Sequence, residues 1–167
     1  MTEISLLPYS TELETEAVSL IQAFWLAHND YVMPYDEAKK DLEAWTTEGH
    51  RLYLVRKDES VIGFAHMGSR GCEIDWLEDL FILPAEQGRG YGSKTISLLE
   101  QIVKEYSESL YIEVAARNRA AAKLYRKLGY DVLNTITVRK DFEPEKFETV
   151  SQETVSGLDY VIRRYKK

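Results

Sequence analysis

The chain has 167 residues, 44% hydrophobic content and a formal net charge of −7, which suits one compact domain. The acidic balance argues against binding to nucleic-acid phosphates, and no run of about 20 apolar residues is present that could span a membrane. Cys72 is the only cysteine, so intrachain disulfides and cysteine-rich metal sites are excluded.

The sequence also lacks a signal-peptide pattern and a metal-binding histidine pair. The first ten residues, MTEISLLPYS, lack a basic region followed by an apolar core, so we expect no signal peptide and a cytoplasmic protein. The three histidines make no ligand pair at helical spacing, and we therefore expect no metal site.

The first half of the chain predicts strands and helices in alternation. Thr11 and Glu14 form a capping-box pattern that indicates the start of a first helix, and Pro34 can begin a second helix. Residues 57–60 have the length and composition of a hairpin turn. The expected elements in order are a strand at 4–8, a helix from 11 to the break at 29–34, a helix at 34–47, and strands at 51–56, 61–67 and 73–83.

The second half continues the same mixed pattern. Residues 90–106 place apolar side chains on one helical face, and Gly129 can end a second helix at 118–128. Strands are expected at 110–115, 130–138 and 158–165, whereas the acidic and polar segment 141–157 is expected to be a partly mobile loop. The order of elements predicts a mixed sheet with helices packed on it.

The densest chemical signal is the segment 77–93, LEDLFILPAEQGRGYGS. A predicted strand leads into a loop with Gly88, Gly90 and Gly92, and the loop leads into a helix. Alternating glycines let successive backbone N–H groups converge on an anion, and the helix N-terminus adds the positive end of its dipole. The loop is therefore a candidate diphosphate site.

Three diphosphate motifs compete for this loop. A dinucleotide fingerprint needs glycine at position 93, where Ser93 stands. An ATP-type loop from Gly88 to Thr95 lacks its second glycine and follows the strand too late. A third pattern, Gln87-x-x-Gly90-x-Gly92, matches in full. A plain glycine-rich turn opening a helix also remains possible from this segment alone.

A second segment decides between them. Asn118-x-x-Ala121-x-x-Leu-Tyr125-x-x-Leu-Gly-Tyr130 follows the strand at 110–115. Together with Gln87-x-x-Gly90-x-Gly92 it resembles the two cofactor motifs of the GNAT superfamily of N-acetyltransferases, over residues 77–130. The resemblance implies one α/β (α+β) domain over residues 1–167. Its mixed, mostly antiparallel sheet would have about seven strands, with the fourth and fifth splayed apart and about four helices around it.

The same resemblance implies acetyl-CoA as cosubstrate. Main-chain groups of Phe81, Ile82 and Leu83 would pair with the pantetheine amides as an added strand, and the N–H of Phe81 could hold the thioester oxygen. The residues implied in binding the rest of the molecule are Gln87, Gly88, Arg89, Gly90, Tyr91, Gly92, Ser93, Asn118, Ala121 and Tyr125.

Acetyl transfer to an amine needs a base, since deprotonating an alkylamine of pKa about 10.4 at pH 7 costs roughly 4.6 kcal/mol. Glu78 and Asp79, directly or through water, are the candidates. On a regular strand they face opposite sides, but the family's strand carries a bulge. Similarity to polyamine acetyltransferases with a Leu-Glu-Asp run favours Glu78. Either carboxylate can instead be a solvated or ion-paired strand residue.

Tyr125 lies two helical turns beyond Asn118, with small residues between. Because a tyrosine pKa of about 10 exceeds a thiol pKa of about 8.5, we expect it to hydrogen-bond the departing thiolate rather than ionise. It can also be a core-facing tyrosine of an amphipathic helix. His66 and Glu113 are interpreted as ordinary strand residues.

The expected function is therefore direct transfer of an acetyl group, in a ternary complex, to an amine of a small molecule such as a polyamine, an aminoglycoside or an amino acid. The alternatives are a non-catalytic acetyl-CoA-binding regulatory module, a protein N-acetyltransferase and, more remotely, an ATP-dependent enzyme. No nucleic acid or membrane partner is expected, and the edge strand 158–165 could support a homodimer.

Overall fold

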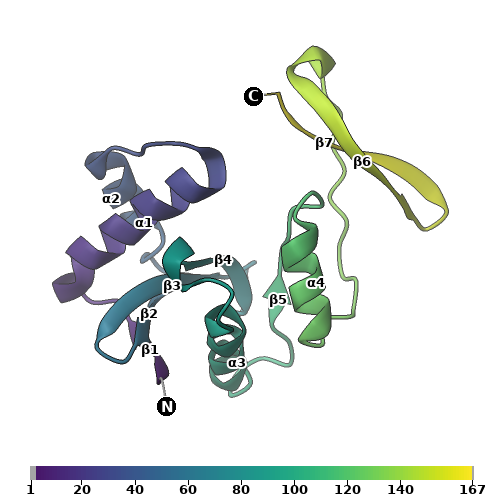
Figure 1. The fold of residues 1–167 in the computed structure, drawn as a ribbon. Helices are drawn as coiled ribbons and strands as arrows, with labels where there is room; N and C mark the ends of the chain where they lie inside the picture. Colours follow the sequence, from purple (N-terminus) through teal and green to yellow (C-terminus); the bar gives the residue numbers. More distant parts are fainter. Residues whose placement is uncertain (1–2, 167) are drawn as a thin grey trace. The chain divides into compact units, whose positions relative to one another are not determined.

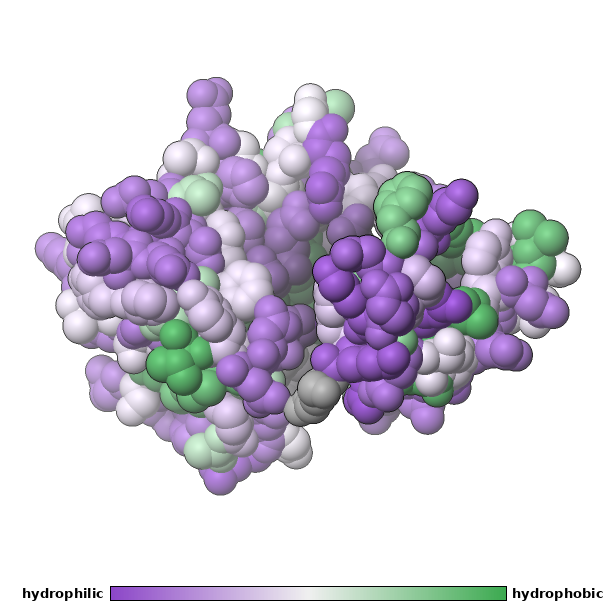
Figure 2. Space-filling view, turned by 90° about the horizontal axis from the view of Figure 1, so that it is seen from above, coloured by the Kyte–Doolittle hydropathy of each residue, from purple (hydrophilic) through white to green (hydrophobic). Residues whose placement is uncertain are grey.

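The computed structural model describes residues 3–166. Contacts divide the chain into two compact units, Met1–Glu113 and Val114–Lys167, and each is described here by itself. The expectation of a single domain over residues 1–167 stays a prediction. None of the helices within residues 3–166 is long and apolar enough to cross a membrane. Most of the surface in view in Figure 2 is hydrophilic, in keeping with the 29% of charged residues.

The first unit is built on a five-stranded sheet with strand order β1-β2-β3-β4-β5. The β1–β2, β2–β3 and β3–β4 pairs are antiparallel and the β4–β5 pair is parallel, which confirms a mixed, mostly antiparallel sheet. Its elements are β1 (Ile4–Pro8), α1 (Glu14–Asn29), α2 (Tyr35–Ala44), β2 (His50–Lys57), β3 (Ser60–Gly68), β4 (Trp76–Ile82), α3 (Tyr91–Val103) and β5 (Tyr111–Ile112).

Helices cover both faces of this sheet, with α1 and α2 on one side and α3 on the other (Figure 1). On the α1/α2 face, Phe64 and Phe81 pack with Val18, Ile21 and Leu42 in a buried cluster. On the α3 face, a second cluster of Ile4, Val55, Ile62 and Ile82 packs against Tyr91 and Leu98. Alternation along the strands thus supplies two apolar layers.

The fourth and fifth strands meet only at their start. β5 pairs with β4 at two positions, Trp76↔Tyr111 and Leu77↔Ile112, although the sequence predicts a longer strand at 110–115. Within the first unit, β4 therefore has a strand partner along its whole length on the β3 side only. The rest of its other edge is left for another partner.

The second unit contains α4 (Arg119–Lys127) and a hairpin of β6 (Phe147–Val155) and β7 (Leu158–Tyr165). The expected strand at 130–138 is not formed, although its composition favours a strand, because a strand needs to pair with another strand and none of the strands within residues 3–166 pairs with this segment. The expected loop at 141–157 is also wrong, because it contains β6. Ser156 and Gly157 both have positive φ, 53° and 77°, which suits a two-residue hairpin turn.

Several predicted boundaries also differ. The capping box at Thr11 is not formed: Thr11–Leu13 is a 3-10 turn, α1 begins at Glu14 without a side-chain cap, and Glu14 instead pairs with Lys39 of α2 at 2.9 Å. The strand expected from residue 73 begins at Trp76. The helices expected to end at 47 and 106 end at Ala44 and Val103. Tertiary contacts override local signals at these ends.

Candidate active site

The glycine loop joins β4 to α3 and leaves open space around its backbone. Gly88 and Gly90 have φ of +74° and +84°, and nothing lies within 4 Å of a Cβ built on Gly88, Gly90 or Gly92. Residues other than glycine rarely adopt such dihedrals. Gly90 is the N-cap of α3 and supplies no side-chain cap, so the first N–H groups of the helix point outward without an internal acceptor. These features fit an anionic diphosphate.

The side chains of Gln87 and Glu86 hold the loop in place through a hydrogen bond and ion pairs. The Gln87 Nε2 donates to the carbonyl oxygen of Ile82 at 2.8 Å. Glu86 accepts from the Lys57 ammonium at 2.8 Å and lies 3.3 Å from Arg89. The hydrogen bond from Lys57 lowers the pKa of the Glu86 carboxyl, and that carboxylate raises the pKa of Lys57. Gln87 and Glu86 thus order the loop, and Lys57 neutralises an acidic group next to it.

Strand β4 carries a bulge at Glu78. His66 of β3 pairs with Asp79, but the next residue, Met67, pairs with Leu77, so Glu78 is an extra residue with no counterpart on β3. Beyond the bulge the register is regular again, from Ala65↔Leu80 to Gly63↔Ile82. The bulge implied by the family resemblance is therefore present.

The bulge places both acidic side chains on one face of the sheet. Asp79 contacts His66, and a Cβ built on Gly68 would lie 2.7 Å from the Glu78 Oε1. Because His66 and Gly68 are two residues apart on β3, they share a face. A regular strand would have turned Glu78 and Asp79 to opposite faces, and the bulge brings them to the same face. The shared face is the one covered by α1 and α2, since His66 stacks on Trp45.

Glu78 belongs to an ion-paired cluster. The Arg70 guanidinium lies 3.0 Å from its Oε2 and 3.4 Å from Glu113. It also lies over the Trp76 ring, 4.7 Å from the centroid, and Trp76 stacks on Tyr111. Arg70 is 49% exposed and so remains accessible to solvent. Glu113, interpreted from the sequence as an ordinary strand residue, follows β5 and joins this cluster.

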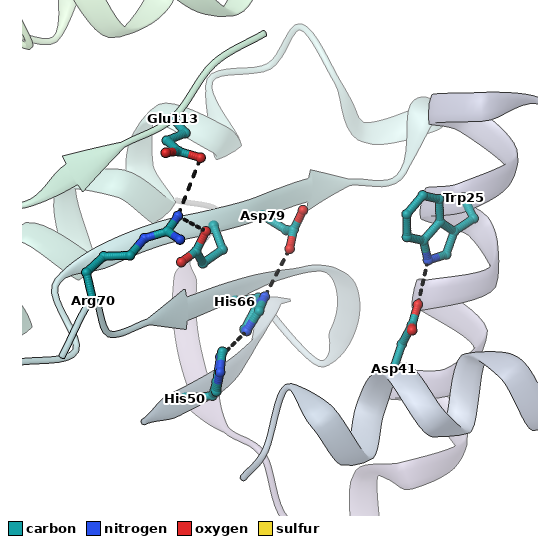
Figure 3. A network of polar contacts seen from close by, with 8 residues as sticks. Trp25, Asp41, His50, His66, Arg70, Asp79 and Glu113 are labelled. Atoms are coloured by element: carbon teal, nitrogen blue, oxygen red, sulfur yellow. Dashed lines mark hydrogen bonds and ion pairs between the residues drawn. The ribbon is translucent and has the colours of Figure 1, made fainter. Parts of the chain in front are cut away.

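Asp79 belongs to a different chain of contacts, drawn in Figure 3. Its Oδ2 lies 2.9 Å from the His66 Nδ1, and the His66 Nε2 lies 2.9 Å from the His50 Nδ1. The His66 ring is 4% exposed and stacks on Trp45 at 4.7 Å between centroids. Strand pairing brings together two histidines that are 16 residues apart. The helical spacing considered from the sequence does not detect such a pair; the alternation of β2 and β3 could have.

The main chain after the bulge presents alternate groups to the open edge of β4. The Leu83 N–H donates to the Ile62 carbonyl at 2.8 Å, and a Cβ built on Gly63 would lie 2.1 Å from the Phe81 carbonyl oxygen. The polar groups of Phe81 and Leu83 thus point toward β3. Alternation turns those of Leu80 and Ile82 to the other edge. Leu80 was missed from the sequence, although strand period alone could have identified it.

In the second unit, the predicted cofactor residues lie on or next to α4. The Asn118 Oδ1 accepts from the Ala121 N–H at 3.2 Å, so its side chain caps the helix. Ala121 and Tyr125 follow on that helix, and the Tyr125 and Tyr130 rings meet edge to face at 6.3 Å. Burial raises the pKa of the Tyr125 phenol above its ordinary value of 10.0. The hydroxyl therefore keeps its proton across the neutral range.

A bulged strand, a glycine loop and a helix N-terminus in direct succession are the features that the resemblance to coenzyme-A-dependent acyltransferases implies. The family model described as "Acetyltransferase (GNAT) family" matches residues 18–130, which is more than half of the chain. The chain therefore belongs to the GNAT family, and it is an acetyl-CoA-dependent N-acetyltransferase. The resemblance drawn from residues 77–130 is confirmed.

Similar proteins agree with this assignment. An acetyltransferase of Yersinia pestis (strain Pestoides F) is 28% identical over 114 residues, which cover 68% of this chain and 81% of that protein. The structure of aminoglycoside N-acetyltransferase AAC(6')-Iy in complex with CoA superposes with a TM-score of 0.64, at 16% identity over 85% of this chain and 97% of that one. An aminoglycoside acetyltransferase from an uncultured soil metagenomic sample, in complex with sisomicin, gives 0.65 at 11% identity over 83% and 95%.

Proposed function

We propose that this acetyltransferase moves the acetyl group directly from acetyl-CoA to an amine of a small cationic molecule, in a ternary complex. One observation carries the proposal: β4 presents two carboxylates on one face and leads into an open, glycine-rich helix N-terminus a few residues later. A single strand thus aligns a group that can accept a proton with a site that can hold a diphosphate.

The loop from Gln87 to Ser93 fits the diphosphate of the cosubstrate. The N–H groups at the start of α3 would bind it, and the outward polar groups of Leu80 and the outward N–H of Ile82, whose carbonyl accepts from Gln87, would pair with the pantetheine arm as an added strand. Bound acetyl-CoA supplies an activated acetyl thioester. We infer that the Leu80 N–H, just after the bulge, would bind the carbonyl oxygen as negative charge develops on it, in place of the Phe81 N–H, which points toward β3.

Charge on the α1/α2 face favours a cationic acceptor. Three carboxylates, those of Glu78, Asp79 and Glu113, lie there against one guanidinium, that of Arg70. An ammonium group is attracted to such an excess of negative charge, most strongly where side chains are partly withdrawn from water. The structural likeness to aminoglycoside acetyltransferases supports an acceptor with several amines. Cytoplasmic location and self-association stay predictions.

Tyr125 is proposed to stabilise the departing thiolate. Its raised pKa makes complete proton transfer to a thiolate of ordinary pKa near 8.5 more unfavourable than the roughly 2 kcal/mol of an unperturbed phenol. A hydrogen bond from the neutral hydroxyl remains favourable, because the charged acceptor strengthens it. Asn118 and Ala121 are proposed to bind the cofactor through the start of α4.

The test is an amine panel that contains sisomicin, neamine, spermidine, amino acids and a peptide N-terminus. Release of free thiol from acetyl-CoA is followed together with the mass of the acetylated amine. We expect thiol release that depends on a small polyamine or aminoglycoside and matches product one to one. Transfer to the peptide alone would instead assign a protein N-acetyltransferase. Tight acetyl-CoA binding without transfer to any amine would contradict the proposal and favour a regulatory module.

A further inference from the structure

Two adjacent carboxylates on one face raise the question of which of them takes the proton from the amine. We propose that Asp79 is the proton acceptor, and that His66, oriented by His50, is the positioning residue that holds it. Glu78 would instead bind the acceptor electrostatically. This inference rests on the proposed function, since it assigns a role within the same amine-acetylating site.

The contacts of Glu78 hold it in an ion pair with a guanidinium, whereas Asp79 has no cation of this kind beside it among residues 3–166. The Glu78 Oε2 accepts from the Arg70 guanidinium at 3.0 Å. Its Oε1 lies above Gly68, at 2.7 Å from where a Cβ would stand. Arg70 is held in turn by Trp76 and Glu113. A carboxylate in this cluster would have to give up an ion pair before it could bind a proton.

The contacts of Asp79 leave one of its carboxylate oxygens able to accept a proton. Its Oδ2 accepts from the His66 Nδ1–H at 2.9 Å, which fixes the plane of the carboxylate. No contact of the Oδ1 is found among residues 3–166, and the side chain is 28% exposed against 5% for that of His66. The carboxylate thus lies where a buried ring meets accessible space, with one oxygen held and one directed away from the ring.

The position of His66 is itself fixed from two sides. Trp45 stacks on the ring with an interplanar angle of 14°. The His50 Nδ1 lies 2.9 Å from the His66 Nε2 and the two rings are stacked. An ionised Asp79 can only accept, so its contact places the proton of a neutral His66 on Nδ1 and leaves Nε2 to accept from the His50 Nδ1–H. In that arrangement His50 supports the tautomer that bonds the carboxylate.

The proposed step conserves atoms and charge. An ammonium N–H bond breaks, its proton binds the Asp79 Oδ1, and the nitrogen keeps the electron pair that forms the new bond to the thioester carbonyl carbon. The carbon–sulfur bond then breaks, and the departing sulfur receives the second proton that the nitrogen gives up, so that an amide and a free thiol result. The neutral acid releases its proton to solvent after each turnover, because the side chain is partly exposed. His66 keeps its own proton throughout.

Other titratable groups around this face are the ones that could confuse a pH profile. Strands β2 and β3, the loop after β3 and the residue after β5 contribute His50, His66, Arg70 and Glu113. The covering helices contribute His28, stacked on Phe24, and Asp41, bonded to the Trp25 indole. Variants of Asp79 and Glu78 compared under the same conditions share all of these groups, so the difference between their profiles reports on the two carboxylates.

The first experiment measures kcat and KM for spermidine and for sisomicin, with saturating acetyl-CoA, between pH about 6 and about 10. Asp79→Asn should lower kcat by ~10²-fold near neutral pH. It should approach the unmodified protein as pH nears the amine pKa of about 10.4, where neutral amine is abundant. Glu78→Gln should mainly raise KM, with a pH profile of kcat parallel to the unmodified one. The reverse pattern would overturn the assignment.

The second experiment separates positioning from packing with a matched pair at His66. His66→Asn keeps an amide donor near the Nδ1 position, whereas His66→Gln places its amide near Nε2, and both lose the stack on Trp45. We expect His66→Gln to lower kcat about tenfold near neutral pH and His66→Asn to retain most of the rate. Equal losses would show that only the ring packing matters.

A third readout needs no turnover. Nitrogen-edited NMR of the unliganded protein should show a slowly exchanging Nδ1–H of His66. That signal should keep its shift in Glu78→Gln and move upfield in Asp79→Asn, where a neutral amide is the weaker acceptor. An unchanged shift in Asp79→Asn would overturn the inferred contact. If the unmodified protein acetylates no amine at all, the proposed function fails and this role fails with it. Transfer with parallel pH profiles for Asp79→Asn removes the Asp79 role alone.

Discussion

The loop at 87–93 and the bulge at Glu78 are neighbours in sequence but are specified in different ways. The loop works through backbone: its glycines adopt left-handed dihedrals and leave space, so the residue types themselves report the geometry. The bulge works through side chains that come from β2, β3, β4 and the segment after β3. A motif can therefore identify the cofactor site, whereas the proton-handling site exists only after the strands pair.

The largest expected effect comes from a substitution in the loop at 87–93. Gly90→Val should abolish acetyl-CoA binding, because it fills the open space and imposes a β-branched side chain on a φ of +84°. Calorimetric titration measures the loss. Gly71→Val is the matched control, since Gly71 has a φ of +98° and equally open surroundings but lies in the segment after β3. Undiminished affinity in a folded Gly90→Val protein would remove the diphosphate site.

A smaller effect, confined to turnover, is expected at Tyr125. Tyr125→Phe should lower kcat by ~10²-fold with little change in acetyl-CoA affinity, because it deletes only the hydroxyl that we propose as the hydrogen-bond donor to the thiolate. Tyr130→Phe, on the neighbouring ring, serves as the control. Unchanged turnover in Tyr125→Phe would mean that the residue only packs against its helix neighbours.

The bulge can be perturbed without touching either carboxylate. Gly68→Ala places a methyl group 2.7 Å from the Glu78 Oε1 and should displace that side chain. If Glu78 binds the acceptor, the KM for the amine should rise several-fold while kcat is kept. A fall in kcat that disappears at high pH would instead make Glu78 the base. Gly68→Ser should raise KM at least as much, because its side chain is larger.

The smallest expected effect concerns the ion pair between Lys57 and Glu86 next to the loop. Lys57→Met leaves the Glu86 carboxylate with Arg89 alone as its counterion and should weaken acetyl-CoA binding by a few-fold at low salt, since exposed ion pairs contribute little. Lys57→Arg should bind normally. Added salt should reduce the difference between the unmodified and Lys57→Met proteins, and a salt-independent difference would contradict the electrostatic explanation.

The same ion pair gives a pH dependence of stability. Lys57 lowers the pKa of the folded-state Glu86 carboxyl from its ordinary value of 4.5. The stabilisation is therefore complete above that value and is lost as pH falls through the lowered pKa. The difference in Tm between the unmodified protein and Lys57→Met should shrink in acid. A difference that grows in acid would contradict this sign.

Local signals predicted the elements whose stability is local. The amphipathic pattern of α3, the hairpin between β2 and β3, and the glycine loop are each encoded within a dozen residues. The segment 130–138 has strand composition and pairs with none of the strands within residues 3–166, while β6 has a polar composition and pairs with β7. Strand formation depends on pairing, and pairing cannot be read from one segment.

The site residues also divide into those that a local motif predicts and those that depend on strand pairing. The family pattern identified Glu78, Asp79 and the loop, but not which main-chain groups face the open edge of β4. The contact of Glu78 with Arg70 depends on a one-residue bulge, because the bulge turns Glu78 to the face that Asp79 shares with His66. A register shift of this kind leaves no mark in composition, so the sequence alone could not separate Glu78 from Asp79.

The most direct test of the account measures binding and turnover on one preparation of Asp79→Asn. We predict that acetyl-CoA binds with unchanged affinity by calorimetry, while the amine-dependent release of thiol near neutral pH falls ~10²-fold. Backbone would then hold the cofactor while a positioned side chain moves the proton. Unchanged turnover, or a loss of affinity in step with turnover, would contradict that division.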